Sequence, residues 1–455
     1  MKTPAIPFHC ESHPSHALTI GEVIFDHQHL LELSVEVGFH KRAPRKIDIC
    51  SLLGSICSGS AKGSPSCNDL AAGIEASHPL QGPSRQAVHL RLGEPMNDFM
   101  DRLVAEVIAD RVAGEPACAD TRPPGRRYAD LYKRIIVQDS TIIQLPRHLF
   151  AEFSGVSNGE AKVCNARVQA TYDLLGDRLI CFSIDPYSKN DLTAATELDI
   201  EPGDLVLRDR GYLTLDEIQR HRDQDADCIY RHKTGTTYLD PTTRQPIDLP
   251  ALLRQSGCLD INVLLNNQAR TPVRLVAAPV SEETANLRRM KARKECRGHN
   301  PSKAALELMS YTIFITTIDA GKADFHRLLS LYALRWRIET IFKAWKSHMK
   351  FDVLHRVSKL QMLIILKARL LLIACCTNII LGPLQRSLWQ SHQARISLLK
   401  LIRFLSDCPA NFVRAIQAVS AAPSEIRSFR KTLLRYCCYD RRVRKNHCQR
   451  LLDVA

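Results

Sequence analysis

The sequence predicts an α/β protein in which a mixed β-sheet is flanked by helical N-terminal and C-terminal regions. Three observations support this prediction. Runs of β-branched residues separated by tight turns begin near residue 134, a weakly patterned β-rich stretch follows, and a long amphipathic helical pattern comes after a last clear strand. The chain has 455 residues with 45% hydrophobic and 24% charged residues, enough for two or three domains with a sizeable core.

Residues 1–128 are expected to form a helical N-terminal region. Apolar residues recur at helical spacing over 17–37 and again over 85–112. Between these two segments, residues 51–84 are rich in Gly, Ser and Cys and are expected to form a loop with short helices. The breaker-rich sequence TRPPGRR at 121–127 predicts a linker at the end of this region.

Residues 129–224 are expected to form the first part of the sheet. The predicted strands are 134–145, 166–175, 178–185 and 204–208, with short helices at 192–198 and 215–222. Gly176 and Asp177 separate the second and third strands by a tight turn, so these two strands are expected to pair in antiparallel fashion.

Residues 225–305 are expected to form a β-rich insertion, and residues 306–382 the second part of the core. This second part holds a strand at 311–317 and helices at about 324–348 and 359–380; residues 383–455 are expected to be helical and basic. Three strands, a helix, a strand, an interruption, a strand and a long helix form an order that is typical of an RNase H-like core.

The charge of the chain indicates a polyanionic partner. The formal net charge is +14 and the sequence pI is about 9.1. Residues 331–455 contain 23 Lys and Arg but only 6 Asp and Glu, so the remainder of the chain is slightly acidic. Nucleic acid fits this concentration of charge better than an anionic membrane surface, because no exposed amphipathic apolar face accompanies the basic residues.

Membrane, secretory and metal-finger classes are not favoured. The longest apolar run, 370–384, is short for a bilayer and is expected to be a buried helix. The N-terminus has no apolar signal core, so the protein is expected in the cytoplasm. None of the sixteen cysteines forms a Cys-x-x-Cys pair, which predicts reduced structural thiols rather than a zinc site or disulfides.

A charged stripe on the predicted helix 324–348 carries the strongest functional signal. On a helical wheel with Tyr332 at 0°, Arg335 falls near 300°, Glu339 near 340° and Lys346 near 320°. A carboxylate flanked by cations in this way can hold a metal ion while Arg and Lys bind phosphate oxygens. The alternative is an ordinary amphipathic helix with Arg–Glu and Glu–Lys pairs at i, i+4 spacing.

Two aspartates strengthen the functional interpretation. Asp139 lies within an apolar predicted strand, where an unpaired charge is costly, and Asp209 follows directly after another apolar strand. Each aspartate alone is compatible with a turn or a helix cap. Together with Glu339 they place three carboxylates on predicted core elements, as two-metal cleavage of phosphodiesters requires.

At these residues the sequence resembles the IS-four family of insertion-sequence transposases. Tyr332, Arg335, Glu339 and Lys346 match the spacing of its Y-R-E-K signature. Asp139-Ser-Thr resembles the first aspartate motif of the family, and Asp209-Arg-Gly-Tyr resembles the second. The resemblance covers roughly residues 85–380 and implies an RNase H-like core with a β-rich insertion before the glutamate.

The resemblance also implies a function and a set of roles. It implies cut-and-paste DNA transposition through a hairpin intermediate, with two Mg2+ ions, or Mn2+ as a substitute, held by Asp139, Asp209 and Glu339. Tyr332, Arg335 and Lys346 would grip the DNA backbone. The implied partners are double-stranded DNA, as element ends and target, and a second copy of the chain in a homodimer on DNA. The implied location is the bacterial nucleoid, and the N-terminal region is a candidate for end binding.

One feature departs from the family pattern. Some relatives stack a flipped base on a tryptophan of the insertion, whereas Trp336, Trp345 and Trp389 all lie outside residues 225–305. Tyr238 is a possible substitute. Two other functions remain open: a metal-dependent nuclease on the same fold, which would not need Tyr332, Arg335 and Lys346 in register, and a non-catalytic transposase-derived repressor, which loss of a carboxylate would have favoured.

Overall fold

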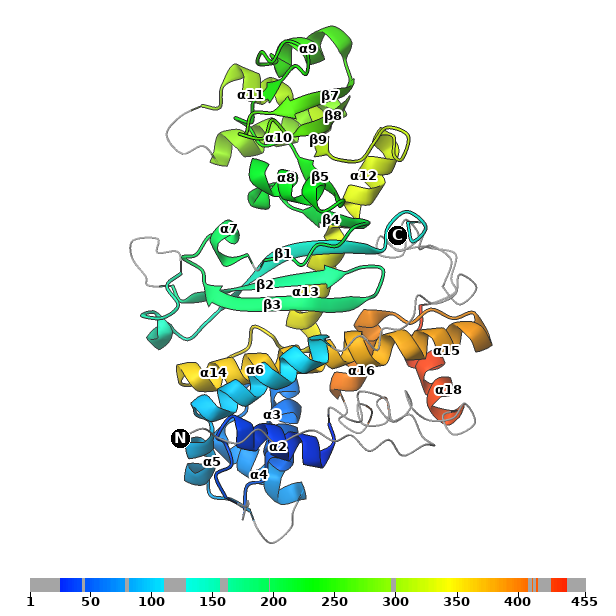
Figure 1. Ribbon diagram of the computed structural model, residues 1–455. Helices are drawn as coiled ribbons and strands as arrows, with labels where there is room; N and C mark the ends of the chain where they lie inside the picture. Colours follow the sequence, from blue (N-terminus) through cyan, green and yellow to red (C-terminus); the bar gives the residue numbers. More distant parts are fainter. Residues whose placement is uncertain are drawn as a thin grey trace, which may run out of the picture.

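The computed structural model describes residues 25–42, 46–77, 82–109, 128–155, 163–195, 197–295, 300–407, 411, 415 and 427–439. The predicted linker at 121–127, the beginning of the helix predicted at 17–37 and the basic run at 441–445 lie outside these residues. Figure 1 shows three tiers: a green lobe at the top, the strands β1 to β3 in the middle, and a layer of helices below.

A nine-stranded mixed sheet forms the centre of the fold. Its strands follow the order β3-β2-β1-β4-β5-β9-β8-β7-β6. The pairs β1–β2 and β2–β3 are antiparallel, whereas β1–β4 and β4–β5 are parallel. The order 3-2-1-4-5 with this orientation is the RNase H arrangement, so the predicted fold class is confirmed. The strands are β1 Arg134–Gln144, β2 Asn165–Asp173, β3 Arg178–Pro186, β4 Asp204–Arg208, β5 Asp227–Arg231, β6 Tyr238–Leu239, β7 Leu259–Leu265, β8 Pro272–Pro279 and β9 Tyr311–Thr316.

The sheet continues from the core into the region predicted as an insertion. Strand β5 lies inside the predicted range 225–305, yet it pairs with β4 as the fifth strand of the core. Strand β9 then pairs with β5, and β8, β7 and β6 follow outward. Helices α9 (Leu249–Ser256), α10 (Glu282–Glu295) and α11 (Lys303–Leu308) complete this upper lobe. The domain boundary at residue 224 stays a prediction, although β4 before it and β5 after it pair directly in one continuous sheet.

Side chains of β1 alternate between two hydrophobic cores, one on each face of the sheet. Ile135 and Val137 pack in a core that also contains Ile338 and Trp345 of α13 (Trp336–His348). Ile136 points to the other face, into a core with residues of β4, β5 and the upper lobe. Because side chains of a strand alternate with period two, the side chain of each β1 residue is assigned to one face by its number. This alternation decides where the charged residues of β1 point.

The N-terminal helices share the first of these cores with strands β1, β2 and β3. They are α2 His27–Glu36, α3 Ile49–Lys62, α4 Cys67–Ser77, α5 Arg85–Arg91 and α6 Glu94–Ala109. Residues 51–84 were expected to form a loop with short helices; the helices α3 and α4 are present and occupy most of the segment. Their small residues permit close packing: a Cβ at Gly73 would lie 2.3 Å from the Ser55 hydroxyl, so α4 approaches α3 more closely than a larger residue would allow.

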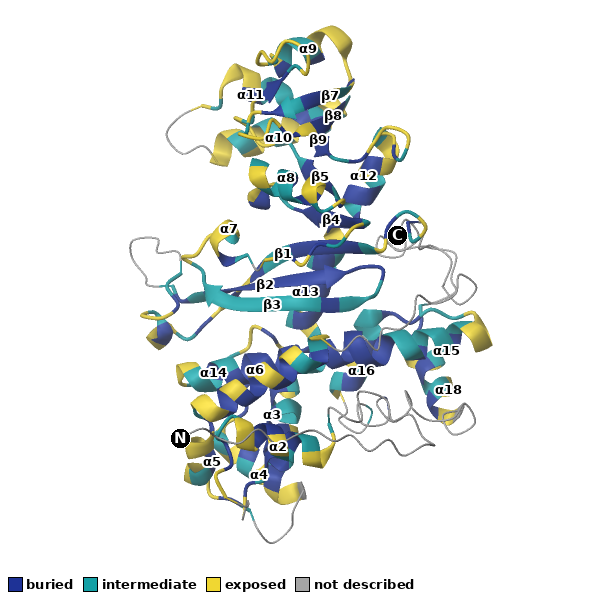
Figure 2. Cartoon of the chain, in the orientation of Figure 1, coloured by how far each residue is buried: buried dark blue, intermediate teal, exposed yellow. Residues whose placement is uncertain are grey.

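One long apolar helix joins the core to the C-terminal part. Helix α14 (Lys359–Ala374) passes through a π-helical turn at Cys375–Leu381 into α15 (Gly382–His392). This helix is long and apolar enough to cross a membrane, but 89% of its most apolar window is buried inside the protein. Figure 2 shows α14 in dark blue where it passes beneath the sheet. It is therefore a core helix, as the sequence predicted for 370–384. Helices α16 (Leu398–Asp407) and α18 (Arg427–Tyr436) pack beside it.

A buried histidine in α8 (Leu215–Asp223) makes stability depend on pH. The ring of His221 stacks on Tyr230, with centroids 6.3 Å apart, and is fully buried. Burial, aided by Arg208, lowers its pKa to about 3. The folded state disfavours the charged imidazolium, whereas the unfolded chain binds the proton below pH 6.5. The free energy of unfolding is therefore highest, as far as His221 is concerned, above pH 6.5 and falls as the pH drops from 6.5 toward 3.

We expect His221→Gln to flatten this pH dependence. The wild type should lose up to about 1.4 kcal/mol of unfolding free energy per pH unit from this group below pH 6. Urea unfolding of both proteins at pH 7, 6 and 5 measures the difference. Identical slopes would show that His221 is not held in its neutral form.

Candidate catalytic site

Asp139 and Asp209 lie at matching positions on two neighbouring parallel strands. The register between β1 and β4 ends at the pair Gln138 and Arg208, so each aspartate is the next residue along its strand. Asp139 is two residues after Val137, and Asp209 is two residues after Leu207, so each points to the same face as that residue. Val137 and Leu207 both belong to the core that contains α13. Both aspartates therefore lie on the face of the sheet that α13 covers.

The third carboxylate comes from a helix that is interrupted beside it. The sequence predicted one helix over 324–348, and this was wrong in one respect: α12 (Phe325–Ala333) and α13 are separated by a turn at Leu334 and Arg335. There the backbone makes tight i to i+3 hydrogen bonds, among them Arg335 N to Tyr332 O at 3.1 Å. The angles of an ideal wheel therefore do not apply across this turn, although Arg335 and Glu339 still meet.

Arg335 joins two of the three carboxylates. Its guanidinium donates to Asp139 Oδ2 at 3.1 Å and to Glu339 Oε1 at 3.2 Å. The side chain of Arg335 is 7% exposed, compared with 41% for Glu339. The arginine thus lies in the interior of the site and the glutamate at its solvent side. This contact brings together residues 196 positions apart in the sequence.

Burial gives Asp139 an unusual affinity for protons. It raises the pKa of Asp139 to about 6, and the carboxylates of Glu339 and Asp209 contribute in the same direction. The Ser140 N–H, at 2.8 Å from Asp139 Oδ1, and the Arg335 guanidinium oppose the rise. Because burial and the neighbouring carboxylates disfavour the charged form of Asp139, an additional cation close to it would stabilise that form.

The donor set of the site fits a hard divalent cation. Three carboxylates supply oxygen ligands, which Mg2+ and Mn2+ prefer, and the single guanidinium of Arg335 balances only part of their charge. Across the described ranges, three potential ligands lie within 4.8 Å of one another only at His27, Asp48 and Cys50. There the carboxylate caps α3 by accepting from backbone N–H groups, so that cluster has a structural explanation.

The other predicted site residues differ in their accessibility. Tyr332 is buried, and its ring packs 5.2 Å from that of Phe314. Lys346 donates from Nζ to the carbonyl of Ile142, at 2.8 Å, near the end of β1. Tyr238, considered as a stacking residue, is 1% exposed and hydrogen-bonded to His232, so it does not offer a free ring face. DNA contacts of Tyr332, Arg335 and Lys346 stay predictions.

Sequence reasoning missed a polar network on the opposite face of β1. Arg167 and Gln169 of β2 and Asp191 of α7 (Asp191–Ala194) surround Ser140, the residue after Asp139. The available signal was Arg167 itself, a basic residue inside a predicted strand. A buried guanidinium requires a partner, and Asp191 provides it.

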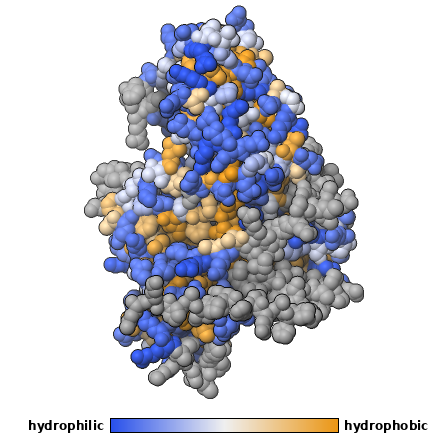
Figure 3. Space-filling model, in the orientation of Figure 1, coloured by the Kyte–Doolittle hydropathy of each residue, from blue (hydrophilic) through white to orange (hydrophobic). Residues whose placement is uncertain are grey.

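A cavity of about 910 Å³ between α6 and β3 lies apart from this site. Its lining includes Ile180, Phe182 and Ile184 of the edge strand β3. In Figure 3 the visible face is mostly hydrophilic, and apolar side chains surface in a band at the height where Figure 1 places β2 and β3. The three carboxylates do not line this cavity, so it has no part in the chemistry that they support.

A mixed sheet of this order, with one carboxylate within the central strand β1, one directly after its parallel neighbour β4 and a third on the covering helix, defines the RNase H-like class of nucleic-acid-processing proteins. Within that class, the chain belongs to the transposase DDE domain family, which matches residues 132–379, more than half of the chain. The predicted resemblance to insertion-sequence transposases is thereby confirmed at the level of the family.

Similar proteins include several insertion-sequence transposases. The transposase for insertion sequence element IS231B of Bacillus thuringiensis subsp. berliner is 25% identical over 309 residues, which are 63% of this chain and 64% of that protein. The IS231C transposase of the same organism is 24% identical over 417 residues, 85% of this chain and 84% of that protein. Among solved structures, a piggyBac transposase synaptic complex with hairpin DNA aligns with TM-score 0.44 and 9% identity, over 95% of this chain and 87% of that chain.

Proposed function

We propose that this protein is a metal-dependent DNA transposase that moves an insertion sequence by a cut-and-paste route. The observation that carries the proposal is the meeting of Asp139, Arg335 and Glu339 beside Asp209, where the pairing of β1 with β4 ends. Membership of the transposase DDE family supports it independently.

Asp139, Asp209 and Glu339 would hold two divalent ions, Mg2+ or Mn2+. When bound, the ions activate the attacking water or 3′-hydroxyl and stabilise the leaving oxygen. The contribution of the chain is to hold the three carboxylates at the ends of a rigid sheet and a packed helix. Arg335, already bonded to two of them, fixes the side chain of Glu339 relative to Asp139.

The proposed substrate is double-stranded DNA, as element ends and as target. Water would nick the end, the freed 3′-hydroxyl would attack the opposite strand to give a hairpin, and the reopened end would be joined to target DNA. Lys346, partly exposed beside β1, is a suitable contact for a phosphate near the carboxylates. The basic segment 331–455 supplies further positive charge for the backbone.

Two element ends must be brought together in this reaction, so we propose a homodimer on DNA. The proposed place of action is the bacterial cytoplasm, at the nucleoid. The family relatives are transposases for bacterial insertion sequences, which supports this location.

Removal of metal tests the proposed function directly. A linear duplex that carries the ends of the element with flanking DNA is incubated with the protein in Mg2+ or in EDTA. We expect nicks at the element boundary in Mg2+, hairpin products at later times, and no cleavage in EDTA. Specific binding without cleavage would instead favour a transposase-derived repressor, and cleavage without preference for the ends would favour a nuclease.

A further inference from the structure

The backbone pairing between β1 and β4 stops just before the two aspartates. The last registered pair is Gln138 and Arg208, and Asp139 and Asp209 come one residue later. Beyond this point no ladder hydrogen bond between these two strands is available to fix the distance between the carboxylates. Strand β1 continues to Gln144 in its ladder with β2, where Asp139 lies opposite Ala170, so other contacts must fix the residues that follow β4 relative to it.

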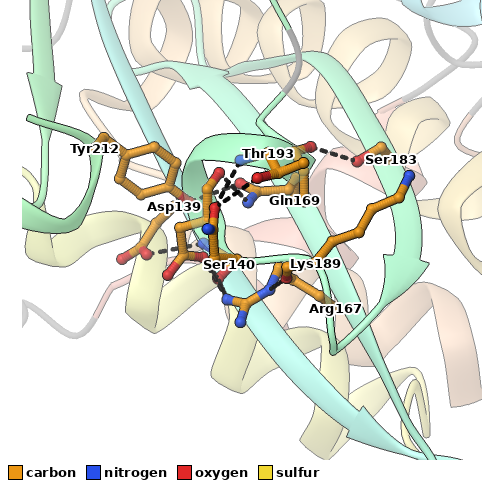
Figure 4. A network of polar contacts seen from close by, with 11 residues as sticks. Asp139, Ser140, Arg167, Gln169, Ser183, Lys189, Thr193 and Tyr212 are labelled. Carbon is orange, nitrogen blue, oxygen red and sulfur yellow. Dashed lines mark hydrogen bonds and ion pairs between the residues drawn. The ribbon is translucent and has the colours of Figure 1, made fainter. Parts of the chain in front are cut away.

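On the opposite face of the sheet, a chain of hydrogen bonds connects Ser140 of β1 with Tyr212 in the turn that follows β4. Ser140, adjacent to Asp139, donates from Oγ to Asp191 Oδ1 at 2.7 Å. The main-chain oxygen of Asp191 accepts from Gln169 Nε2 at 3.3 Å, and Gln169 Oε1 accepts from the hydroxyl of Tyr212 at 2.6 Å. Tyr212 lies three residues after Asp209 in the turn that follows β4. Figure 4 shows this network extending from Asp139 and Ser140 to Tyr212.

Arg167 holds Asp191 in the centre of the network. Its guanidinium bonds to the Asp191 carboxylate and, at 3.1 Å, to the Ser140 hydroxyl, while Nε donates to the carbonyl of Lys189 at 3.0 Å. The Arg167 side chain is 8% exposed and stacks over the ring of Tyr187 at 4.8 Å. Such a guanidinium keeps its counter-ion in one position, because an unpaired buried charge is costly.

Asp191 is poorly placed to act as a metal ligand. Its Oδ1 already accepts from two donors, Ser140 and Arg167. Ser140 points away from the face that carries Asp139, because neighbouring residues of a strand point to opposite sides. The Oδ1 atom of Asp191 is therefore bound to a side chain of the face opposite Asp139.

We propose that Asp191 is a positioning residue, which fixes the relative placement of Asp139 and Asp209 through Ser140 of β1 on one side and through Gln169 and Tyr212, in the turn after β4, on the other. The inference rests on the proposed function, since it assigns the two aspartates to the reaction. Its physical basis is separate: the network replaces the missing ladder contacts at the point where the two strands present their carboxylates.

The decisive variant is Asp191→Asn, with Asp185→Asn as the matched control. Asp185 is a carboxylate near the end of β3 that pairs with Nζ of Lys189 at 2.6 Å, and its side chain bonds to none of Ser140, Asp191, Gln169 and Tyr212. In the boundary-cleavage assay at saturating Mg2+, we expect Asp191→Asn to lower the rate about 10–100-fold, as for residues that orient metal ligands. Duplex affinity in EDTA should stay within about twofold of the wild type, and Asp185→Asn should cleave at the wild-type rate.

Two further variants distinguish positioning from other roles. Ser140→Ala should lower the rate by a similar factor, Ser140→Thr should retain more of it, and the loss in the Ser140→Ala, Asp191→Asn double variant should be less than the product of the two single losses. Restoration of Asp191→Cys by Mn2+ would overturn the proposal in favour of a metal ligand. Loss of folding or of DNA affinity together with the rate would overturn it in favour of a structural role.

A readout without cleavage separates this inference from the proposed function. Mg2+ should raise the melting temperature of the wild-type protein and of Asp185→Asn, and should raise that of Asp191→Asn less. If the wild type fails to cleave its element ends, the proposed function fails. The role of Asp191 is then decided by the Mg2+-dependent rise in melting temperature alone, compared between Asp191→Asn and the wild type. Equal Mg2+ shifts in all three proteins, or an Asp191→Asn rate within twofold of the control, would overturn the inference.

Discussion

Glu339→Gln is expected to abolish strand cleavage while DNA binding and folding remain. The glutamate is the more exposed of the two carboxylates that Arg335 binds, and its ion pair at the solvent side contributes little to stability. Glutamine keeps the size of the side chain and can still accept from Arg335, but it loses the charge that a divalent ion requires. We expect the cleavage rate to fall by roughly 1000-fold or more.

The measurement pairs boundary cleavage in Mg2+ with duplex binding in EDTA. Glu282→Gln is the control, because Glu282 is also an exposed glutamate bonded to an arginine, Arg289, but lies on α10 in the upper lobe. The control should cleave normally. If Glu339→Gln unfolds or loses affinity for the duplex to the same degree as it loses cleavage, Glu339 is a structural residue of the helix.

Arg369→Leu is expected to cause the largest loss of stability. Arg369 of α14 is fully buried and donates to four main-chain oxygens, those of Ser60, Gly63, Phe351 and Val353. Burial lowers its pKa to about 10, so the side chain is still charged at neutral pH. Leucine would remove this donor from two buried carbonyls, those of Ser60 and Phe351, at a cost of about 1–3 kcal/mol each, and from two partly buried ones, those of Gly63 and Val353.

We therefore expect the unfolding free energy to fall by about 4 kcal/mol or more in Arg369→Leu, measured by urea denaturation. Arg403→Leu is the matched control. Arg403 is 69% exposed and pairs with Asp407 at 3.7 Å, so its replacement should change stability by no more than about 0.5 kcal/mol. A comparably small effect for Arg369→Leu would mean that water can reach and satisfy the four carbonyls.

The strands of the core could be predicted from the sequence because they contain runs of β-branched and other apolar residues between turns. In β1, the runs Ile135–Val137 and Ile142–Ile143 lie on either side of Asp139. Strand β5 has the same short pattern as β4, three apolar residues between an Asp and an Arg, so nothing in its own sequence separated it from the strands of the insertion. Only its pairing with β4 identifies it as part of the core.

Tertiary contacts decided the elements that the sequence did not predict. Helix α3 is rich in Gly, Ser and Cys, which are poor indicators of a helix, but its small residues permit close packing with α4 and α14. The turn at Arg335 was hidden because the apolar spacing runs through it without a Gly or Pro. The apolar strands around the two aspartates, the polar stripe around Glu339 and the family resemblance together predicted the three carboxylates as site residues, whereas the contact of Arg335 with Asp139 required the fold.

The unbroken sheet has a consequence for how such proteins diversify. Because β6 is the outermost strand, chain can be gained or lost at that border during evolution without touching the hydrogen bonds between β4 and β5. Removal of β9, by contrast, would strip β5 of its outer neighbour and expose a new edge next to the strand that carries Asp209. Length variation among descendants of a common ancestor should therefore concentrate on the far side of the lobe, while its inner strand is inherited together with the catalytic core.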